Sequence, residues 1–207
     1  MEKWQNKTFN QGPNQGVTTP EQSPFESLSR ERELAEYARD QITYAGFFVD
    51  PEEVYAKFPP SLSHRIRYPH ITTAYHPGIK ELFLDSLGSE AKIKVIAYGD
   101  DGKNQGLLVE VEADDPAIQK ALVERVAPDN TGEKKPVPIH ITLSISDDAE
   151  AVDTRNLHFE PLEVPVELKG NYKLFRKDGT LISDKDTIIN MQSAGFVSPE
   201  IDDPDRL

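Results

Sequence analysis

Apolar and polar side chains alternate along two stretches of the chain, and both stretches contain the letters His-Ile-Thr. The first reads PHITTAYH over residues 69–76, and the second reads PIHITLSI over residues 138–145. Alternation with a period of two residues is typical of a strand with one apolar face. We therefore predict a strand in each stretch, the first over about residues 66–75.

Side chains two residues apart share one face of a strand. His70 therefore shares a face with Thr72, and His140 shares a face with Thr142. The opposite face of the second strand is apolar and consists of Ile139, Ile141, Leu143 and Ile145. The face that carries each His and Thr is polar, so it is either solvated or part of a site.

Apolar spacing elsewhere predicts further helices and strands. Helices are expected after the capping residue Ser29, over 51–58, over 79–87 and after Asp115. Strands are expected over 43–49, 91–98, 107–113 and within 158–183, where Lys177, Asp178 and Gly179 mark a turn. The order strand, helix, strand recurs around each His-Ile-Thr. We interpret this as a weak internal duplication with halves near 43–113 and 114–183.

The two ends of the chain differ in composition from its middle. Residues 1–28 are rich in Gln, Asn, Thr, Pro and Gly without an apolar period. Such a segment buries little apolar surface, so we expect a disordered N-terminal tail that is available to a protein partner. The folded domain is expected over residues 29–183, followed by a C-terminal extension over 184–207.

Composition and charge restrict the class of protein. The 207 residues contain no cysteine, which excludes disulfides and a Cys nucleophile and fits a reducing cytosol. The sequence shows no signal peptide and no apolar run near the ~20 residues that span a bilayer, so we expect a cytoplasmic protein without a membrane partner. The net charge of −13 repels polyanions at long range. A small nucleotide or a short RNA end is therefore easier to accept as a partner than a long nucleic-acid track, and the acidity can also simply keep the protein soluble.

A His and a Thr presented twice are suited to the chemistry of a phosphate diester. In-line displacement at phosphorus needs a base beside the entering oxygen and an acid beside the leaving oxygen, and histidine titrates in the required range. Hydroxyl groups can donate to the non-bridging oxygens, where negative charge grows. We therefore take His70, Thr72, His140 and Thr142 as candidate catalytic residues, with either histidine as the acid and with neither a metal nor another cofactor.

The motifs HITTAY and HITLSI resemble the paired His-x-Thr signature of the 2H phosphoesterase superfamily. This superfamily includes LigT-type RNA cyclic phosphodiesterases, the cyclic phosphodiesterase domains of fungal tRNA ligases, 2′,5′-oligoadenylate-cleaving enzymes and phage anti-CBASS nucleases. The resemblance covers about residues 43–176. It implies an α+β, bilobal fold in which two pseudo-symmetric lobes with antiparallel sheets flank a central cleft.

The expected activity is a metal-independent phosphodiesterase acting on a cyclic phosphate or on a 2′,5′ or 3′,5′ linkage in RNA ends or small oligonucleotides. Degradation of cyclic oligonucleotide immune signals is an alternative within this class. Residues near the motifs that are candidates for substrate binding are Tyr68, Arg65, Arg67, Lys134 and Lys135. Tyr68 could stack on a base, and the cations could meet a phosphate, although packing and solvation explain these residues as well.

Three alternatives to this chemistry follow from the same residues. A zinc site would need a third protein ligand, and no local His, Asp or Glu pattern supplies one. A Ser-His-Asp hydrolase would need a Gly-x-Ser-x-Gly segment, which the chain lacks. A nucleotide- or RNA-binding module without turnover would keep the cleft, but it would not need both His-x-Thr pairs intact.

Overall fold

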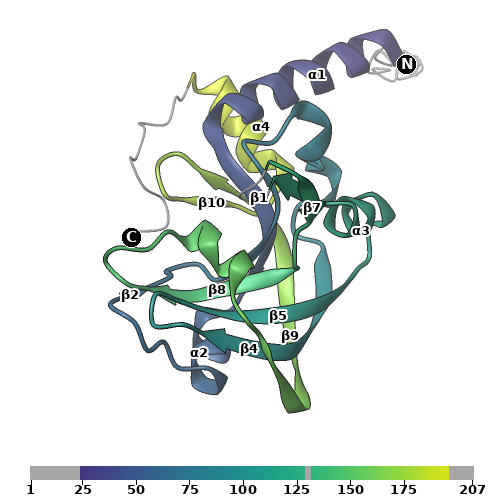
Figure 1. Cartoon of the computed structure of the whole chain (residues 1–207). Helices are drawn as coiled ribbons and strands as arrows, with labels where there is room; N and C mark the ends of the chain where they lie inside the picture. The colour runs from purple at the N-terminus through teal and green to yellow at the C-terminus, as the bar shows by residue number, and fades with distance from the viewer. Residues whose placement is uncertain (1–23, 129–131, 196–207) are drawn as a thin grey trace, which may run out of the picture.

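The computed structural model describes residues 24–128 and 132–195, which form a mixed α+β fold around a mostly antiparallel sheet (Figure 1). The predicted tail is outside the described residues up to residue 23, as is the end of the predicted C-terminal extension from residue 196. Within the described ranges, no helix has the length and apolar character needed to cross a bilayer. The α-helices are α1 (Pro24–Gln41), α2 (Pro51–Lys57), α3 (Pro116–Val123) and α4 (Lys185–Ser193).

Eight strands belong to one sheet, in the order β2-β8-β5-β4-β9-β1-β3, and β10 pairs with β9. Every pairing in the described residues is antiparallel. The strands of this sheet are β1 (Ile42–Val49), β2 (His64–Arg65), β3 (His70–Tyr75), β4 (Glu90–Asp100), β5 (Asn104–Ala113), β8 (His140–Ile145), β9 (Glu160–Arg176) and β10 (Leu181–Ile182). A separate two-stranded sheet pairs β6 (Val126–Pro128) with β7 (Lys134–Pro136).

Strand β9 makes the sheet continuous. Its first part pairs with β4, and its last seven positions, from Gly170 to Arg176, pair with β1. In Figure 1, β9 runs from the group of β4, β5 and β8 toward β1. The eight strands therefore form one long sheet, and the groups β1-β3 and β8-β5-β4 are joined through β9.

The two His-Ile-Thr strands lie toward opposite ends of this sheet, yet β3 and β8 contact each other. The sheet must therefore curl so that its ends approach. Each His strand follows a helix in the chain, and it pairs with the strand that comes before that helix. Strand β3 pairs with β1 and follows α2, whereas β8 pairs with β5 and follows α3. The predicted order of strand, helix and strand around each motif is confirmed.

The helices of these two units begin in the same way. Asp50 accepts from the backbone N–H of Glu52, and Asp115 accepts from that of Ala117, so each carboxylate caps the first turn of its helix. A proline follows each cap, where its missing N–H costs no hydrogen bond. The starts of these two helices, at Pro51 and after Asp115, are as the sequence predicted.

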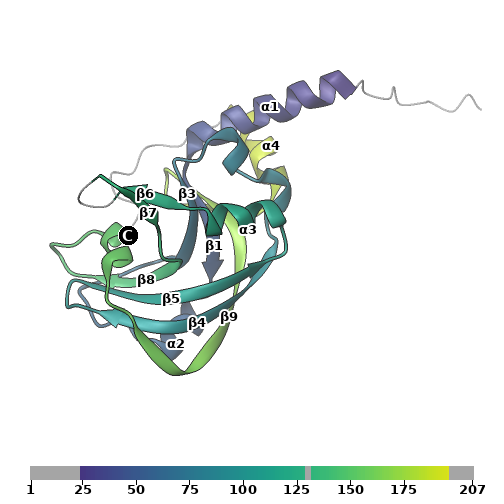
Figure 2. The ribbon, with the colours of Figure 1, turned by 45° about the vertical axis from the view of Figure 1, so that its right-hand side comes forward.

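A core of aliphatic and aromatic side chains supports the sheet. Strand β1 is buried along its whole length, between β9 and β3, as expected for a continuous apolar run. Phe47 on β1 and Tyr172 on β9 are fully buried and meet edge to face, with ring centroids 5.5 Å apart. Helices α1 and α4 lie together at one end of the molecule and α2 lies at the opposite end (Figures 1 and 2).

Three predictions of local structure need correction. The first helix begins at Pro24 and not after Ser29, which lies inside it and donates to Glu33 at 3.3 Å. The helix predicted over 79–87 is two 3₁₀ turns, η1 (Ile79–Glu81) and η2 (Leu84–Ser86), interrupted at Phe83, which has a φ of 43°. No strand was predicted over residues 128–136, but this segment contains β7 and the end of β6.

The predicted boundary between duplicated halves is also wrong. The halves were placed at 43–113 and 114–183, but β5 (Asn104–Ala113) pairs with β8 and so belongs with the second His strand. The end of β9 pairs with β1 and so belongs with the first. The similar units are thus not two consecutive halves of the chain.

Candidate active site

Both His-Ile-Thr motifs line one cavity of about 550 Å³. Strand β3 contributes His70, Thr72 and Tyr75, and β8 contributes His140, Thr142 and Ile145. The remaining wall is formed by Tyr44, Ile66, Arg125 and the segment around the 3₁₀ helix η3 (Ala151–Asn156). Residues from motifs 70 positions apart are therefore brought to one site by the curl of the sheet.

Each histidine is held by the backbone of its own strand. His70 Nδ1 lies 2.8 Å from the carbonyl oxygen of Tyr68, and His140 Nδ1 lies 2.8 Å from that of Pro138. A carbonyl oxygen only accepts, so in both rings Nδ1 carries the proton and donates. In the neutral rings Nε2 is then an acceptor. Two imidazoles in the same tautomer, each with Nε2 available for proton exchange, share the cavity.

Aromatic side chains pack on the first of these rings. Tyr44 stacks on His70 at 4.3 Å between centroids, with 14° between the planes, and Phe48 stacks at 5.1 Å. Tyr44 also stacks on Phe175 at 4.6 Å. This packing fixes the orientation of the His70 ring and shields part of it from water.

Burial lowers the pKa of both histidines to about 4. Desolvation is the larger cause, because it disfavours the charged ring. The hydrogen bond from each Nδ1 to a carbonyl raises the pKa in part, and the nearby Arg125 cation lowers it further at both rings. Both rings are neutral at pH 7 in the unliganded protein. A bound anion would favour protonation of one of them.

Two arginines supply positive charge to the cavity, and neither was predicted from the sequence. Arg125 follows α3, and its Nη1 donates to the carbonyl oxygen of Thr72 at 2.7 Å. Arg155 lies on η3. Burial and the charge of Arg155 lower the pKa of Arg125, so the two cations are close enough to repel each other. Among the described residues neither forms an ion pair with a carboxylate, which leaves both charges for an anion.

The two threonines have different surroundings. The Thr142 hydroxyl oxygen lies 3.0 Å from that of Thr154 and 3.4 Å from the carbonyl oxygen of Ala151. No described side chain hydrogen-bonds the Thr72 hydroxyl, and the Thr72 backbone carbonyl is the group that Arg125 binds. Both side chains line the cavity beside their histidines, as the strand alternation predicted.

Glycines stand opposite both motifs at equivalent positions. Gly46 on β1 pairs with Thr72, and Gly106 on β5 pairs with Thr142. A register shift immediately precedes each glycine, between Ala45 and Gly46 and between Gln105 and Gly106. The two His-x-Thr strands are thus held by the same irregular pairing, a similarity that supports an internal duplication at the site.

The predicted polar face of the second strand is interrupted after Thr142. Ser144 was expected on the face of His140 and Thr142, but it is fully buried and hydrogen-bonds Gln105. Ile145, expected on the opposite face, lines the cavity instead. Gln105 pairs with Ser144 and Gly106 pairs with Thr142, so Leu143 is an extra residue on β8 at this point. Such a bulge breaks the strict alternation of faces.

The residues predicted to bind substrate do not line the described cavity. Tyr68 packs against the cluster of Tyr44, Phe48 and Phe175, and only its carbonyl reaches the site, through His70. The Arg65 guanidinium lies 4.2 Å from the centroid of Tyr55, and that of Arg67 lies 5.0 Å from the centroid of Tyr68. Lys134 and Lys135 are exposed on β7.

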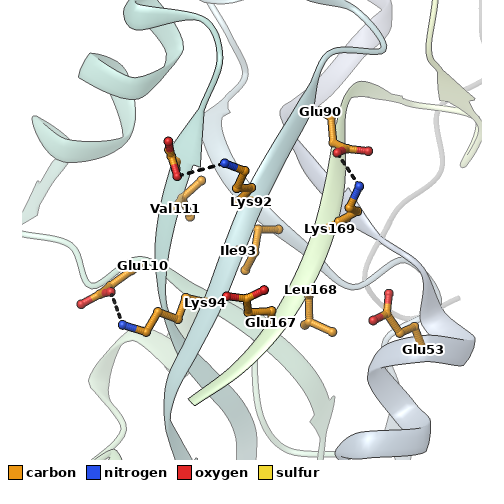
Figure 3. A pocket seen from close by; sticks show the side chains of 11 residues that line it. Glu53, Glu90, Lys92, Ile93, Lys94, Glu110, Val111, Glu167, Leu168 and Lys169 are labelled. Atoms are coloured by element: carbon orange, nitrogen blue, oxygen red, sulfur yellow. Dashed lines mark hydrogen bonds and ion pairs between the residues drawn. The ribbon is translucent and has the colours of Figure 1, made fainter.

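A second hollow, of about 620 Å³, lies over β4, β5 and β9 (Figure 3). Its exposed charges form cross-strand pairs, including Lys94 with Glu110 at 3.4 Å and Lys169 with Glu90 at 2.8 Å. Such exposed pairs stabilise a sheet weakly. The hollow contains neither a histidine nor an arginine, so the cavity at the His-Ile-Thr motifs is the candidate active site.

Within the described ranges, no three His, Asp or Glu side chains are grouped as ligands for a metal ion. The charged residues that line the candidate site are two arginines, Arg125 and Arg155, and one carboxylate, Glu150, beside the two histidines. The balance of charge is positive and favours an anion. Comparison of the chain with models of known protein families and with curated proteins finds no match. The case for a function therefore depends on the geometry of the site.

Proposed function

We propose that this protein is a metal-independent phosphodiesterase in which His70 and His140 act as general acid and base. The observation that carries the proposal is the matched state of the two rings, each with Nδ1 bound to a backbone carbonyl two residues earlier and both in one cavity. Under this proposal the fold is a bilobal 2H phosphoesterase fold, in which the units β1-α2-β3 and β5-α3-β8 are the cores of pseudo-symmetric lobes.

The proposed reaction is hydrolysis of a phosphodiester by in-line displacement. One neutral histidine accepts a proton at Nε2 from the attacking water as the oxygen–phosphorus bond forms. The other histidine, protonated at Nε2, donates that proton to the leaving oxygen as its bond to phosphorus breaks. Thr72 and Thr142 donate to the non-bridging oxygens, and Arg125 and Arg155 balance the negative charge.

The lowered pKa values of the two histidines fit one role as the base and one as the acid. With both rings neutral in the free protein, one is ready as the base, and the other gains its proton when the anionic substrate enters. Arg125 opposes that protonation in the free cavity. A bound phosphate offsets the effect of the arginine, so protonation of the acid is coupled to substrate binding.

The substrate is proposed to be compact. A cavity of about 550 Å³ is in the range of small-ligand sites and accommodates a nucleotide or a short oligonucleotide end. The candidate classes are 2′,3′-cyclic phosphates, 2′,5′ and 3′,5′ linkages in short RNA, and cyclic oligonucleotides of the kind used as immune signals. We propose a cytoplasmic location, because nucleotides of these classes occur there.

The test is turnover of a panel in the presence of EDTA. The panel contains 2′,3′-cyclic nucleotides, 2′,5′-oligoadenylate and cyclic di- and trinucleotides, with products identified by mass. We expect turnover of at least one class with EDTA present. Turnover that stops in EDTA and returns with a divalent ion would contradict the metal-independent mechanism, and tight binding without turnover would favour a binding module.

A further inference from the structure

A chain of hydrogen-bonding groups runs from Asn104, on the strand β5 that pairs with β8, to the Thr142 hydroxyl. Asn104 is buried on β5, and its Nδ2 lies 3.3 Å from the hydroxyl oxygen of Thr154. Thr154 is fully buried on η3, and its hydroxyl oxygen lies 3.0 Å from that of Thr142. The proposed function uses Thr142 but assigns no role to the other two residues.

The orientation of the Asn104 amide is fixed by a second bond. Nδ2 also donates to the backbone carbonyl oxygen of Glu150 at 2.7 Å. That oxygen can only accept, so the NH₂ group and not the amide oxygen must face η3. The same NH₂ group therefore donates to Thr154, and the Thr154 oxygen is an acceptor in this contact.

The single proton of the Thr154 hydroxyl then has one described acceptor, the Thr142 oxygen. At 3.0 Å either hydroxyl could donate to the other, but an amide that only donates from one side favours donation onward from Thr154. The Thr142 proton is left to point elsewhere. Without a ligand it can reach the Ala151 carbonyl at the long distance of 3.4 Å, and with a ligand it can reach a phosphate oxygen in the cavity.

We propose that Asn104 and Thr154 are positioning residues that orient the Thr142 hydroxyl as a donor toward one non-bridging oxygen of the bound phosphate. The inference rests on the proposed function for its ligand, a phosphate group. It makes the two halves of the site unequal, because no described side chain hydrogen-bonds the Thr72 hydroxyl. The donor at Thr142 is oriented before the substrate binds, whereas the donor at Thr72 must be ordered by the substrate.

Thr154 offers a matched pair of substitutions. A Cβ atom on Gly106 would lie 2.4 Å from Thr154 Cγ2, so the Thr154 methyl group packs tightly against β5. Thr154→Val keeps this methyl and removes the hydroxyl, whereas Thr154→Ser keeps the hydroxyl and removes the methyl. If Thr154 acts by packing, Thr154→Ser should weaken phosphate binding more than Thr154→Val. If Thr154 acts by orienting Thr142, Thr154→Val should weaken it more.

The first measurement is binding of inorganic phosphate by titration calorimetry, which needs no turnover. We expect Thr154→Val to weaken phosphate binding about tenfold, the size of one hydrogen bond to a charged group. Thr154→Ser should bind within about twofold of wild type. Asn104→Asp replaces the donor by an acceptor, reverses the polarity of the chain and should weaken binding at least as much as Thr154→Val.

The second measurement is a double-mutant cycle with Thr142→Val, applied to phosphate binding and to kcat/KM on the panel substrate that is cleaved. If Thr154 acts only through Thr142, the double variant binds phosphate no more weakly than Thr142→Val alone and has the same kcat/KM. The matching cycle of Thr72→Val with Thr154→Val should be additive. For turnover, we expect Thr154→Val to raise KM, as it weakens phosphate binding, and also to lower kcat, because the donated bond strengthens in the transition state.

The outcomes separate the inference from the proposed function. Two results overturn the inference and leave the phosphodiesterase proposal intact. One is that the effects of Thr142→Val and Thr154→Val are additive, and the other is that Thr154→Ser binds phosphate more weakly than Thr154→Val. A wild-type protein that binds phosphate and shows the coupled cycle but cleaves no panel member supports the oriented hydroxyl and contradicts the proposed function. Wild-type protein that binds no phosphate contradicts the inference.

Discussion

A Cβ atom on Gly46 would lie 2.1 Å from the backbone carbonyl oxygen of Ile71, the residue between His70 and Thr72. The equivalent atom on Gly106 would lie 3.0 Å from the carbonyl oxygen of Ile141, between His140 and Thr142. Each His-x-Thr strand therefore depends on the absence of a side chain across from it. The closer approach is at Gly46, where the obstacle is backbone.

Gly46→Ala should consequently destabilise the fold. The new methyl group cannot be accommodated unless β1 and β3 separate, so we expect the free energy of unfolding to fall by about 1–3 kcal/mol or more. Chemical denaturation measures this change. Gly106→Ala should cost less, because its closest neighbour is a side-chain methyl group of Thr154.

Gly78→Ala is the control for both variants. Gly78 is exposed with a φ of −68°, and a Cβ atom there would lie 3.4 Å from Glu81 Oε2, an ordinary contact. Its stability should remain within about 0.5 kcal/mol of wild type. Equal effects of the alanine substitutions at Gly46 and Gly78 would contradict the role of close packing at the motif.

The histidines should make stability depend on pH. Their pKa is about 4 in the folded protein and 6.5 in the ordinary ring, so the unfolded chain binds more protons between these values. The contribution of the two rings to stability is complete above pH 6.5 and is lost as pH falls toward 4. We expect the double variant His70→Gln/His140→Gln to show a smaller loss of stability between pH 7 and pH 5 than wild type.

Denaturant titrations at the two pH values measure this difference. His158→Gln is the matched control, since His158 is exposed and outside the cavity, and it should leave the pH dependence of wild type unchanged. A double variant with the full wild-type pH dependence would show that the two site histidines are not held neutral by the fold.

Arg125 should influence both histidines through its charge. Desolvation is the main cause of the lowered pKa values, and Arg125 adds to it at His70 and at His140. Arg125→Gln should therefore raise the pKa of both rings, as followed by NMR titration, and weaken binding of inorganic phosphate. Arg125→Lys keeps a cation and should keep both pKa values near those of wild type.

The lysines selected from the sequence provide the contrast. Lys134 and Lys135 are exposed on β7 and do not line the cavity, so Lys134→Gln and Lys135→Gln should leave phosphate affinity within about twofold. Weaker binding in these variants than in Arg125→Gln would mean that the anion site lies at β7 and not at the cavity.

The part of the site that could be predicted from sequence is the part with a local period. Two-residue alternation placed His70 beside Thr72 and His140 beside Thr142, and the cavity contains all four. Alternation failed at Ser144 and Ile145, which follow the register shift between β5 and β8. A bulge of this kind depends on how two strands pair, and the period of one strand does not reveal it.

The arginines could not be predicted in this way. Arg125 meets Thr72 across 53 positions of sequence, and it does so because the sheet curls and brings β3 toward β8. Basic residues close to the motifs in sequence, such as Arg65 and Arg67, instead stack on tyrosines. Nearness in sequence was therefore a poor guide to the charge in the cavity. The starts of α2 and α3 were predicted correctly, because the residues that begin a helix are local in sequence.

The most direct test of the account is the pH–rate profile of wild type and of the variants His70→Gln and His140→Gln on the panel substrate that is cleaved. A neutral base and a protonated acid give a bell-shaped profile for wild type, with apparent pKa values that belong to the coupled pair. Each variant should lose about 10²–10⁴-fold in rate. One variant should lose the acidic limb and the other the basic limb. Wild-type rates with an intact bell in either variant would contradict acid–base catalysis by this pair.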